Sequence, residues 1–215
     1  MNTKEKFVVT INRELGSGGR TVGEKVAAKL GVSFYDKAVI KSLTAKYHLS
    51  TEAIENLKGL KHDWWSDFKR SLGMGLAMGN PVEYYIPVAG DEPYLLTADD
   101  VFETECEILK GIAAEESCVI AGRLGFFLMK DHPNHISVLI QAPKDYRIAR
   151  VMEKQGLSRD EAEKAIDKVD KLRENYVKHY ADTSRYDARN YDLVINSAGK
   201  TEDEIASLIL SYMQE

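Results

Sequence analysis

The sequence has few cysteines and no long apolar run. Only Cys106 and Cys118 occur among its 215 residues, which is too few for the disulfide framework of a small secreted domain. No apolar stretch approaches the roughly 20 residues that a membrane-spanning helix requires. The first residues also lack the basic and apolar regions of a signal peptide. We therefore expect a cytoplasmic protein that does not associate with membranes.

Several kinds of catalytic and binding site are also missing. The five histidines have no metal-ligand spacing, and no Ser-His-Asp or Cys-His pattern is present. The formal net charge of −5 argues against a surface that binds nucleic acid or anionic lipid. A local basic pocket remains compatible with this charge, so a small anionic substrate is a better expectation than a polymer.

Short apolar segments alternate with segments of helical periodicity along the chain. With 44% hydrophobic and 29% charged residues, the composition is that of one globular domain. This alternation predicts an α/β fold, in which right-handed crossovers join the strands of a parallel sheet and helices cover both faces. We expect the strands at residues 7–11, 32–36, 118–121, 135–142 and 192–196.

A glycine-rich stretch near the start organises the chain. An apolar, β-branched strand is followed by a turn with three glycines and a serine, and then by a helix that Gly31 ends. Glycines let successive backbone N–H groups point into one hollow, and the helix directs its positive end there. A tight structural turn is the alternative, but the strand and helix on either side favour a phosphate loop. Its residues are Gly16, Ser17, Gly18, Gly19, Arg20 and Thr21.

This loop departs from the pattern G-x-x-x-x-G-K-[ST], and it can be aligned with that pattern in two registers. In the first register, Gly18 is the last glycine and Gly19 occupies the lysine position. In the second register, Arg20 replaces the lysine and Thr21 becomes the candidate Mg²⁺ ligand. Neither register restores the first glycine, whose position is taken by Arg13 or Glu14. Arginine keeps the positive charge of lysine but presents a planar fork, so the change affects catalysis more than phosphate binding.

Polar residues follow two further strands at the edge where parallel sheets bind ligands. Asp36 and Lys37 end the second strand, and Arg123 follows the third. The alternatives are a helix cap with solvated lysines for the first pair and a surface salt bridge for Arg123. We favour an anion ligand for Arg123 because its fork suits phosphate. Arg147 and Arg150 lie on one face of a later helix.

Two segments outside this alternation have a different composition. Residues 61–93 are rich in glycine, proline and aromatics, which predicts an inserted lobe. Its aromatics could grip a cofactor, but packing within the lobe or a subunit contact in a homodimer is the simpler reading. A capping box at Ser158 begins a long charged helix that runs to about His179. Its charges suit either a solvated face or a lid that closes over phosphates.

Taken in order, these segments resemble the cytidylate-kinase-like branch of the P-loop nucleoside monophosphate kinases, almost from end to end. The resemblance rests on residues 11–20, 34–37, 119–123 and 191–196, on Ala142 with Arg147 and Arg150, and on Asp170 with Arg173 and Tyr176. It implies a five-stranded sheet of order 2-3-1-4-5. It also implies a core of residues 1–36, 97–151 and 187–215, an acceptor-binding lobe at about 37–96, and a lid at about 152–186.

The resemblance also implies an activity, namely transfer of the γ-phosphoryl group of ATP, with Mg²⁺, to a small acceptor such as CMP or dCMP. Residues from Gly16 to Thr21 would then bind the donor, and Arg20, Arg123 and Arg173 would act in catalysis. The implied substrate-binding residues are Arg13, Asp36, Lys37, Arg123, Arg147, Asp170 and Arg173.

Three departures from the family pattern keep other functions open. The loop lacks its lysine, residues 37–42 lack the family's Tyr-Arg segment, and Ile166 stands where the family's lid has arginine. One alternative is a nucleotide-binding sensor or interaction module without transfer activity. The other is a kinase for a metabolite that is not a nucleotide.

Overall fold

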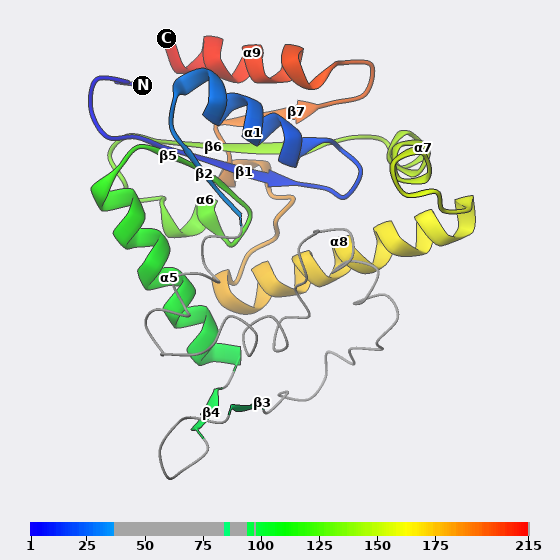
Figure 1. The fold of residues 1–215 in the computed structure, drawn as a ribbon, viewed down its shortest axis with the longest axis horizontal. Coiled ribbons are helices and arrows are strands. Elements are labelled where there is room, and N and C mark those ends of the chain that lie inside the picture. The colour runs from blue at the N-terminus through cyan, green and yellow to red at the C-terminus, as the bar shows by residue number, and fades with distance from the viewer. Residues whose placement is uncertain (37–83, 87–93, 97, 215) are drawn as a thin grey trace. The chain divides into compact units, whose positions relative to one another are not determined.

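The computed structural model describes residues 1–36, 84–86, 94–96 and 98–214 (Figure 1). The chain divides into two compact units, residues 1–36 with 110–215 and residues 37–109, and each is described by itself. The expected acceptor-binding lobe at 37–96 lies mostly outside the described residues. The phosphate loop and the arginines of the later segments all belong to the first unit.

The first unit contains a five-stranded parallel sheet. In chain order the strands are β1 (Val8–Arg13), β2 (Ser33–Tyr35), β5 (Cys118–Ala121), β6 (His135–Gln141) and β7 (Leu193–Asn196), arranged as β2-β5-β1-β6-β7. Counting only these strands, the order is 2-3-1-4-5, which confirms the predicted fold. Val8 pairs with both Cys118 and His135, so the strands start nearly level and their carboxyl ends share one edge.

Helices cover both faces of this sheet. α1 (Gly19–Leu30) and α9 (Glu202–Gln214) pack together on one face, and α6 (Gly125–Leu128) lies against β1 and β6 on the other (Figure 1). α7 (Lys144–Gln155) packs against α8 (Arg159–Ala181), and a short 3-10 helix, η1 (Ala188–Asn190), precedes β7. The two helices after β6 therefore stand together, close to its carboxyl end.

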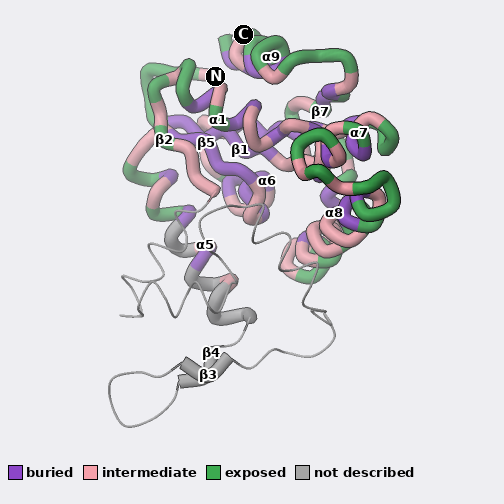
Figure 2. Tube along the Cα trace, turned by 45° about the vertical axis from the view of Figure 1, so that its right-hand side comes forward, coloured by how far each residue is buried: buried purple, intermediate pink, exposed green. Residues whose placement is uncertain are grey.

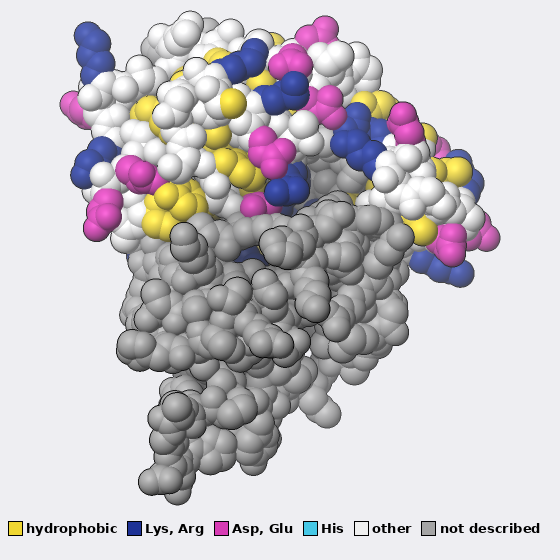
Figure 3. Space-filling model, viewed as in Figure 1, with side chains coloured by type: hydrophobic (Ala, Val, Ile, Leu, Met, Phe, Trp, Pro, Cys, Tyr) yellow, Lys and Arg dark blue, Asp and Glu magenta, His cyan; other side chains and the backbone are white. Residues whose placement is uncertain are grey.

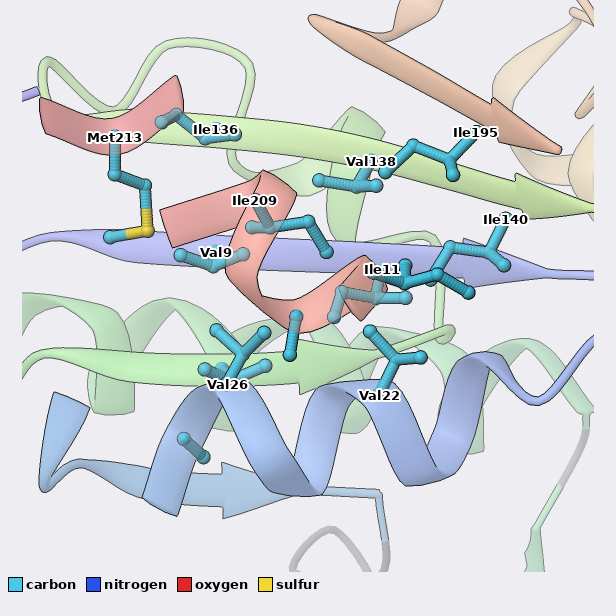
Figure 4. Packing of buried hydrophobic residues seen from close by; sticks show 14 of the residues in the cluster. Val9, Ile11, Val22, Val26, Ile136, Val138, Ile140, Ile195, Ile209 and Met213 are labelled. Atoms are coloured by element: carbon cyan, nitrogen blue, oxygen red, sulfur yellow. The ribbon is translucent and has the colours of Figure 1, made fainter. Parts of the chain in front are cut away.

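The core of the unit lies between the sheet and the α1/α9 pair. Val9 and Ile11 of β1 face Val22 of α1 and Ile209 of α9, and all four are fully buried (Figure 4). Most of β1, β5 and β6 is buried, whereas the outer sides of α7 and α9 are exposed (Figure 2). Because side chains alternate along a strand, Arg13 continues the series of Val9 and Ile11 on the α1 side. The core-facing row of β1 therefore ends in a cation.

Two helix starts agree with the sequence. The side chain of Ser158 accepts a hydrogen bond from the Glu161 backbone N–H, and the Glu161 carboxylate accepts one from the Ser158 backbone N–H. Thr201 and Glu204 form the same reciprocal pair at the start of α9. The capping box predicted at Ser158 is confirmed, and each of the two boxes satisfies donors that the helix leaves free.

The described part of the second unit is small. β3 (Tyr84–Ile86) pairs with β4 (Tyr94–Leu96) in antiparallel fashion, with Tyr84 opposite Leu96. α5 (Ala98–Glu115) begins in this unit and ends in the first. None of the helices in the described ranges is both long and apolar enough to cross a membrane.

Candidate active site

The loop between β1 and α1 ends at a helix terminus with free donors. Gly16 and Gly18 adopt left-handed conformations, with φ of 84° and 82°, and Gly18 is the N-cap residue of α1. Gly18 has no side chain that could cap this terminus, and no acidic residue lies in the first turn. The first N–H groups of a helix have no partner within it, and they carry the positive end of the helix dipole. The loop can therefore bind an anion such as phosphate.

Neighbouring helices hold the loop in place. The Leu15 N–H donates to Asp170 Oδ1 of α8 at 3.0 Å, and the Ser17 hydroxyl donates to the Glu14 carbonyl at 2.9 Å. A Cβ atom on Gly16 would lie 2.8 Å from the Arg147 carbonyl oxygen of α7, so only glycine fits there. The loop backbone is thus fixed before any ligand binds.

The start of α1 bears on the register of the loop. Gly19 is the first helical residue, and a Cβ atom there would lie 2.5 Å from Arg13 Cβ. Gly18 is then the glycine that closes the loop, which favours the first register, with Gly19 at the lysine position. In that register Thr21 lies one residue beyond the hydroxyl position of the motif. Its role as a Mg²⁺ ligand stays a prediction.

Asp170 lies at the centre of the charged residues near the loop. Its carboxylate is 2.6 Å from Arg147 Nη1, 3.7 Å from Arg173 Nη1 and 3.5 Å from Arg185 Nη1. Its residue is only 8% exposed. One buried carboxylate therefore faces three arginines while it also accepts the Leu15 N–H, and the cluster holds an excess of positive charge.

Arg147 joins three parts of the first unit. Its Nε donates to the Ala142 carbonyl at 2.9 Å, and its Nη1 donates to the Leu15 carbonyl at 3.3 Å as well as to Asp170. Glu14 Oε2 lies 3.4 Å from the same Nε and accepts the Ala142 N–H at 2.9 Å. These contacts position the loop against α7 and α8. A direct contact between Arg147 or Asp170 and substrate stays a prediction.

Arg173 and Arg185 converge on the backbone of Arg13. Arg173 Nη1 donates to the Arg13 carbonyl at 3.0 Å, and Arg185 Nη2 donates to the same oxygen. Arg185 is fully buried, yet its Nε and Nη1 have no hydrogen-bond acceptor among the described residues. Buried donors normally have partners. Asp170 Oδ1 lies 3.5 Å from Nη1, and Nε has no acceptor among the described residues, so this buried cation can still take up an anion.

Arg20 points to a different set of partners. Its Nε donates to Asp36 Oδ2 at 2.6 Å, and its Nη2 lies 3.2 Å from Glu24 Oε1. The structure thus brings Asp36 next to the first turn of α1, where the sequence placed it. Two carboxylates flank Arg20, so much of its charge is already compensated.

The Arg13 side chain lies between the loop and the end of β5. A Cβ atom on Gly122 would lie 2.1 Å from Arg13 Nη1. Burial, together with the charges of Arg173, Arg185 and Arg123, holds the pKa of the Arg13 guanidinium well below its usual value, although Asp36 opposes this shift. Burial and then Arg185 likewise lower the pKa of Arg173 to about 10. Both shifts come first from burial and then from neighbouring positive charge.

The structure thus brings together most of the predicted site residues at the carboxyl edge of the sheet. Lys37 lies outside the described residues. Arg185 was not singled out from the sequence, because it falls in an irregular stretch after α8 where no periodicity marks it. In the sequence Glu14 stood out only as a departure from the glycine pattern, and this pattern does not indicate its contacts with Arg147 and Ala142.

Metal-ligating clusters are not found in the described ranges, where no three His, Cys, Asp or Glu side chains come together. Basic and acidic side chains are interspersed over the described part of the face in Figure 3. A Mg²⁺ ion that arrives with a nucleotide needs only one or two protein ligands, since phosphate and water supply the others. The described residues are therefore compatible with a Mg²⁺ ion that arrives with a nucleotide.

Solved structures of similar fold include kinases. The chain aligns with an uncharacterized protein from Eubacterium ventriosum at a TM-score of 0.70 and 23% identity, covering 98% of this chain and 99% of that one. It aligns with shikimate kinase from Bacteroides thetaiotaomicron at a TM-score of 0.51 and 15% identity, covering 97% of this chain and 98% of that one. With a gluconokinase from Sinorhizobium meliloti the TM-score is 0.51 and the identity 16%, and the alignment covers 98% of this chain and 94% of that one. These likenesses show a P-loop kinase-like fold.

Sequence comparison gives a more specific result. The chain is 28% identical over 160 residues to a cytidylate kinase of Methanopyrus kandleri, which covers 70% of this chain and 78% of that protein. It is 29% identical over 121 residues to a cytidylate kinase of Sulfolobus acidocaldarius, which covers 54% and 65%. The model of the cytidylate kinase-like family matches residues 8–199, from the first residue of β1 to beyond β7. This match spans the loop, the arginine cluster and the whole sheet, and the chain belongs to the cytidylate kinase-like family.

Proposed function

We propose that the protein transfers the γ-phosphoryl group of ATP, with Mg²⁺, to a nucleoside monophosphate, CMP or dCMP above others. Membership of the cytidylate kinase-like family supports this, as do the two relatives that carry the name cytidylate kinase. The kinase-like fold of the first unit is consistent with it. The identity of the acceptor rests on the family alone.

One observation carries the proposal. The uncapped N-terminus of α1 and the cluster around Asp170 meet at the same edge of the sheet, because Leu15 of the loop binds Asp170 directly. Phosphoryl transfer asks mainly for alignment of the phosphates and neutralisation of their charge. Free backbone donors beside an excess of arginines supply both.

The residues divide the work as follows. Backbone N–H groups of the loop, from Gly16 to Thr21, bind the donor phosphates, while Arg147 and Asp170 hold that loop in position. Arg123 and Arg173 neutralise charge that develops in the transition state, where a fixed donor is worth about 10²–10³ in kcat. ATP supplies the phosphoryl group when bound, and Mg²⁺ lowers the charge on its phosphates.

The test is release of ADP by the purified protein with Mg²⁺-ATP and each nucleoside monophosphate in turn, alongside ATP binding by calorimetry. We expect release that depends on the acceptor and is greatest with CMP or dCMP. ATP binding without such release would instead favour a nucleotide-binding module, and release only with a hydroxylated metabolite would favour a different kinase.

A variant pair separates catalysis from folding. Arg173→Met should lower kcat about 10²-fold, because it removes a cation at the edge of the sheet. Lys171→Met, at an exposed position two residues earlier on α8, is the matched control and should leave kcat unchanged. Equal kcat values for the two variants would contradict a catalytic role of Arg173.

A further inference from the structure

The loop has no cation at the position where the P-loop pattern has lysine. With α1 beginning at Gly19, that position carries no side chain at all. Arg20 follows directly, but its guanidinium is paired with Asp36 and Glu24 and its side chain is 37% exposed. The charge that the pattern requires must therefore come from elsewhere in the fold.

Arg13 occupies the space that the missing lysine leaves. In the register that the helix start favours, Arg13 is at the position of the first glycine of the pattern. Its Cβ and Cγ lie against Gly19, where an added Cβ atom would be 2.5 and 3.2 Å from them. Its Nη1 reaches Gly122 at the end of β5. Relative to the P-loop pattern, Arg13 therefore replaces the first glycine, and Gly19 replaces the lysine.

The surroundings of this guanidinium call for an anion. Arg173, Arg185 and Arg123 all act on Arg13 as like charges, and Asp36 already accepts a hydrogen bond from Arg20. Arg185 is bonded to the Arg13 carbonyl and is fully buried, with Nε and Nη1 unsatisfied among the described residues. Nη1 has only Asp170 Oδ1 at 3.5 Å, and Nε has no acceptor in the part of the chain that the structure describes, which is evidence for a ligand that is independent of the helix terminus.

We propose that Arg13 is the loop cation of this protein, and that its guanidinium binds the phosphate chain of the nucleotide in place of a lysine at position 19. This proposal rests on the proposed function in one respect only, namely that the bound phosphate chain belongs to a nucleotide. It also explains why positions 19 and 122 are glycine, since a side chain at either would collide with Arg13.

Binding of inorganic tripolyphosphate and of ADP, each measured by calorimetry, provides the first test. Arg13→Met keeps the length of the side chain and removes its charge. We expect at least a tenfold loss of affinity for both ligands, as for other hydrogen bonds to charged groups. Arg189→Met, at a side chain that is 89% exposed, is the matched control and should bind as the unchanged protein does. Full affinity in Arg13→Met would overturn the proposal.

Exchanging the two residues provides the second test, which does not depend on whether Arg13→Met folds. Gly19→Lys alone should unfold at lower temperature and bind tripolyphosphate poorly, because its Cβ meets Arg13. Arg13→Gly alone should lose affinity. Together they restore the glycine and lysine of the standard pattern and should recover melting temperature and affinity beyond the sum of the single effects. A pair that recovers neither would overturn the proposal.

These outcomes are distinguishable from failure of the proposed function. Tripolyphosphate binding needs no acceptor and no transfer, so the assignment of Arg13 can be tested even if no monophosphate is phosphorylated. Conversely, phosphorylation of CMP that Arg13→Met leaves unchanged would refute the role of Arg13 and leave the kinase activity standing.

Discussion

The two ends of β1 show two different ways of using burial. Along Val9 and Ile11 the strand packs on Val22 and Ile209 in a wholly apolar layer. One step further, at Arg13, the same row of side chains enters a cluster of arginines around one carboxylate. The apolar layer gains free energy from burial, whereas burying like charges costs it.

This difference separates what folds the unit from what the unit does. The layer under α1 and α9 is complete in itself, because each of its side chains finds apolar neighbours. Within the described ranges the charged edge is incomplete, because Arg185 Nε has no hydrogen-bond acceptor there and the pKa values of Arg13 and Arg173 are lowered. An anion would complete the edge and leave the layer unchanged.

The largest effect is expected at the charged edge. Asp170→Ala removes the carboxylate that faces Arg147, Arg173 and Arg185, and should lower the free energy of unfolding by about 3–5 kcal/mol. Chemical denaturation measures this loss. Asp167→Ala, on the same helix but 60% exposed, is the control and should cost less than about 1 kcal/mol. Equal losses for the two variants would show that the edge is not held by Asp170.

A slightly smaller effect is expected in the apolar layer. Ile209→Ala leaves a cavity beneath β1 and should cost about 3 kcal/mol, while Leu208→Ala at a 49% exposed position should change stability by less than about 0.5 kcal/mol. Added tripolyphosphate sharpens the comparison. It should raise the melting temperature of Asp170→Ala relative to its ligand-free value, whereas the deficit of Ile209→Ala against the unchanged protein should persist with or without the anion.

The effect that is smallest for each pH unit concerns the amino end of the sheet. Burial lowers the pKa of His135, which is hydrogen-bonded to Thr10 Oγ1 at 2.8 Å, from 6.5 to about 4. Between these values the unfolded chain binds a proton and the folded protein does not. Stability should therefore fall as the pH drops from 6.5 towards 4, by up to about 1.4 kcal/mol per pH unit. His135→Gln should flatten this slope in denaturation curves, and an unchanged slope in this variant would contradict the prediction.

The fold could be predicted from the sequence because its signals are local. Apolar runs such as 118–121 and 135–142 fix strands, and capping boxes at Ser158 and Thr201 fix helix starts. The strand order, by contrast, depends on which runs pair across the sheet. It came from the family resemblance and not from the runs themselves.

The site could be predicted only in part, for a physical reason. The glycines and the arginines after strands are visible as residue types, but their pairing is not. Nothing in the sequence indicates that Arg20 turns to Asp36 while Arg13 turns to Gly122, because these choices depend on backbone positions far apart along the chain. Arg185 escaped notice for the same reason, since only tertiary structure buries it. The parts predicted for Arg20, Arg123 and Lys37 in catalysis or binding stay predictions.

The turn after β5 has a consequence for how this protein can change. Gly122, Arg123 and Leu124 have positive φ in succession, and the last two are not glycine. A left-handed conformation costs such residues about 1–2 kcal/mol each. Glycine at position 123 would relieve part of this strain and would also remove a cation from the carboxyl edge of the sheet. If Arg123 neutralises phosphate charge as proposed, stability and activity oppose each other at this one residue, and a search for heat-resistant variants would favour proteins with a weakened site.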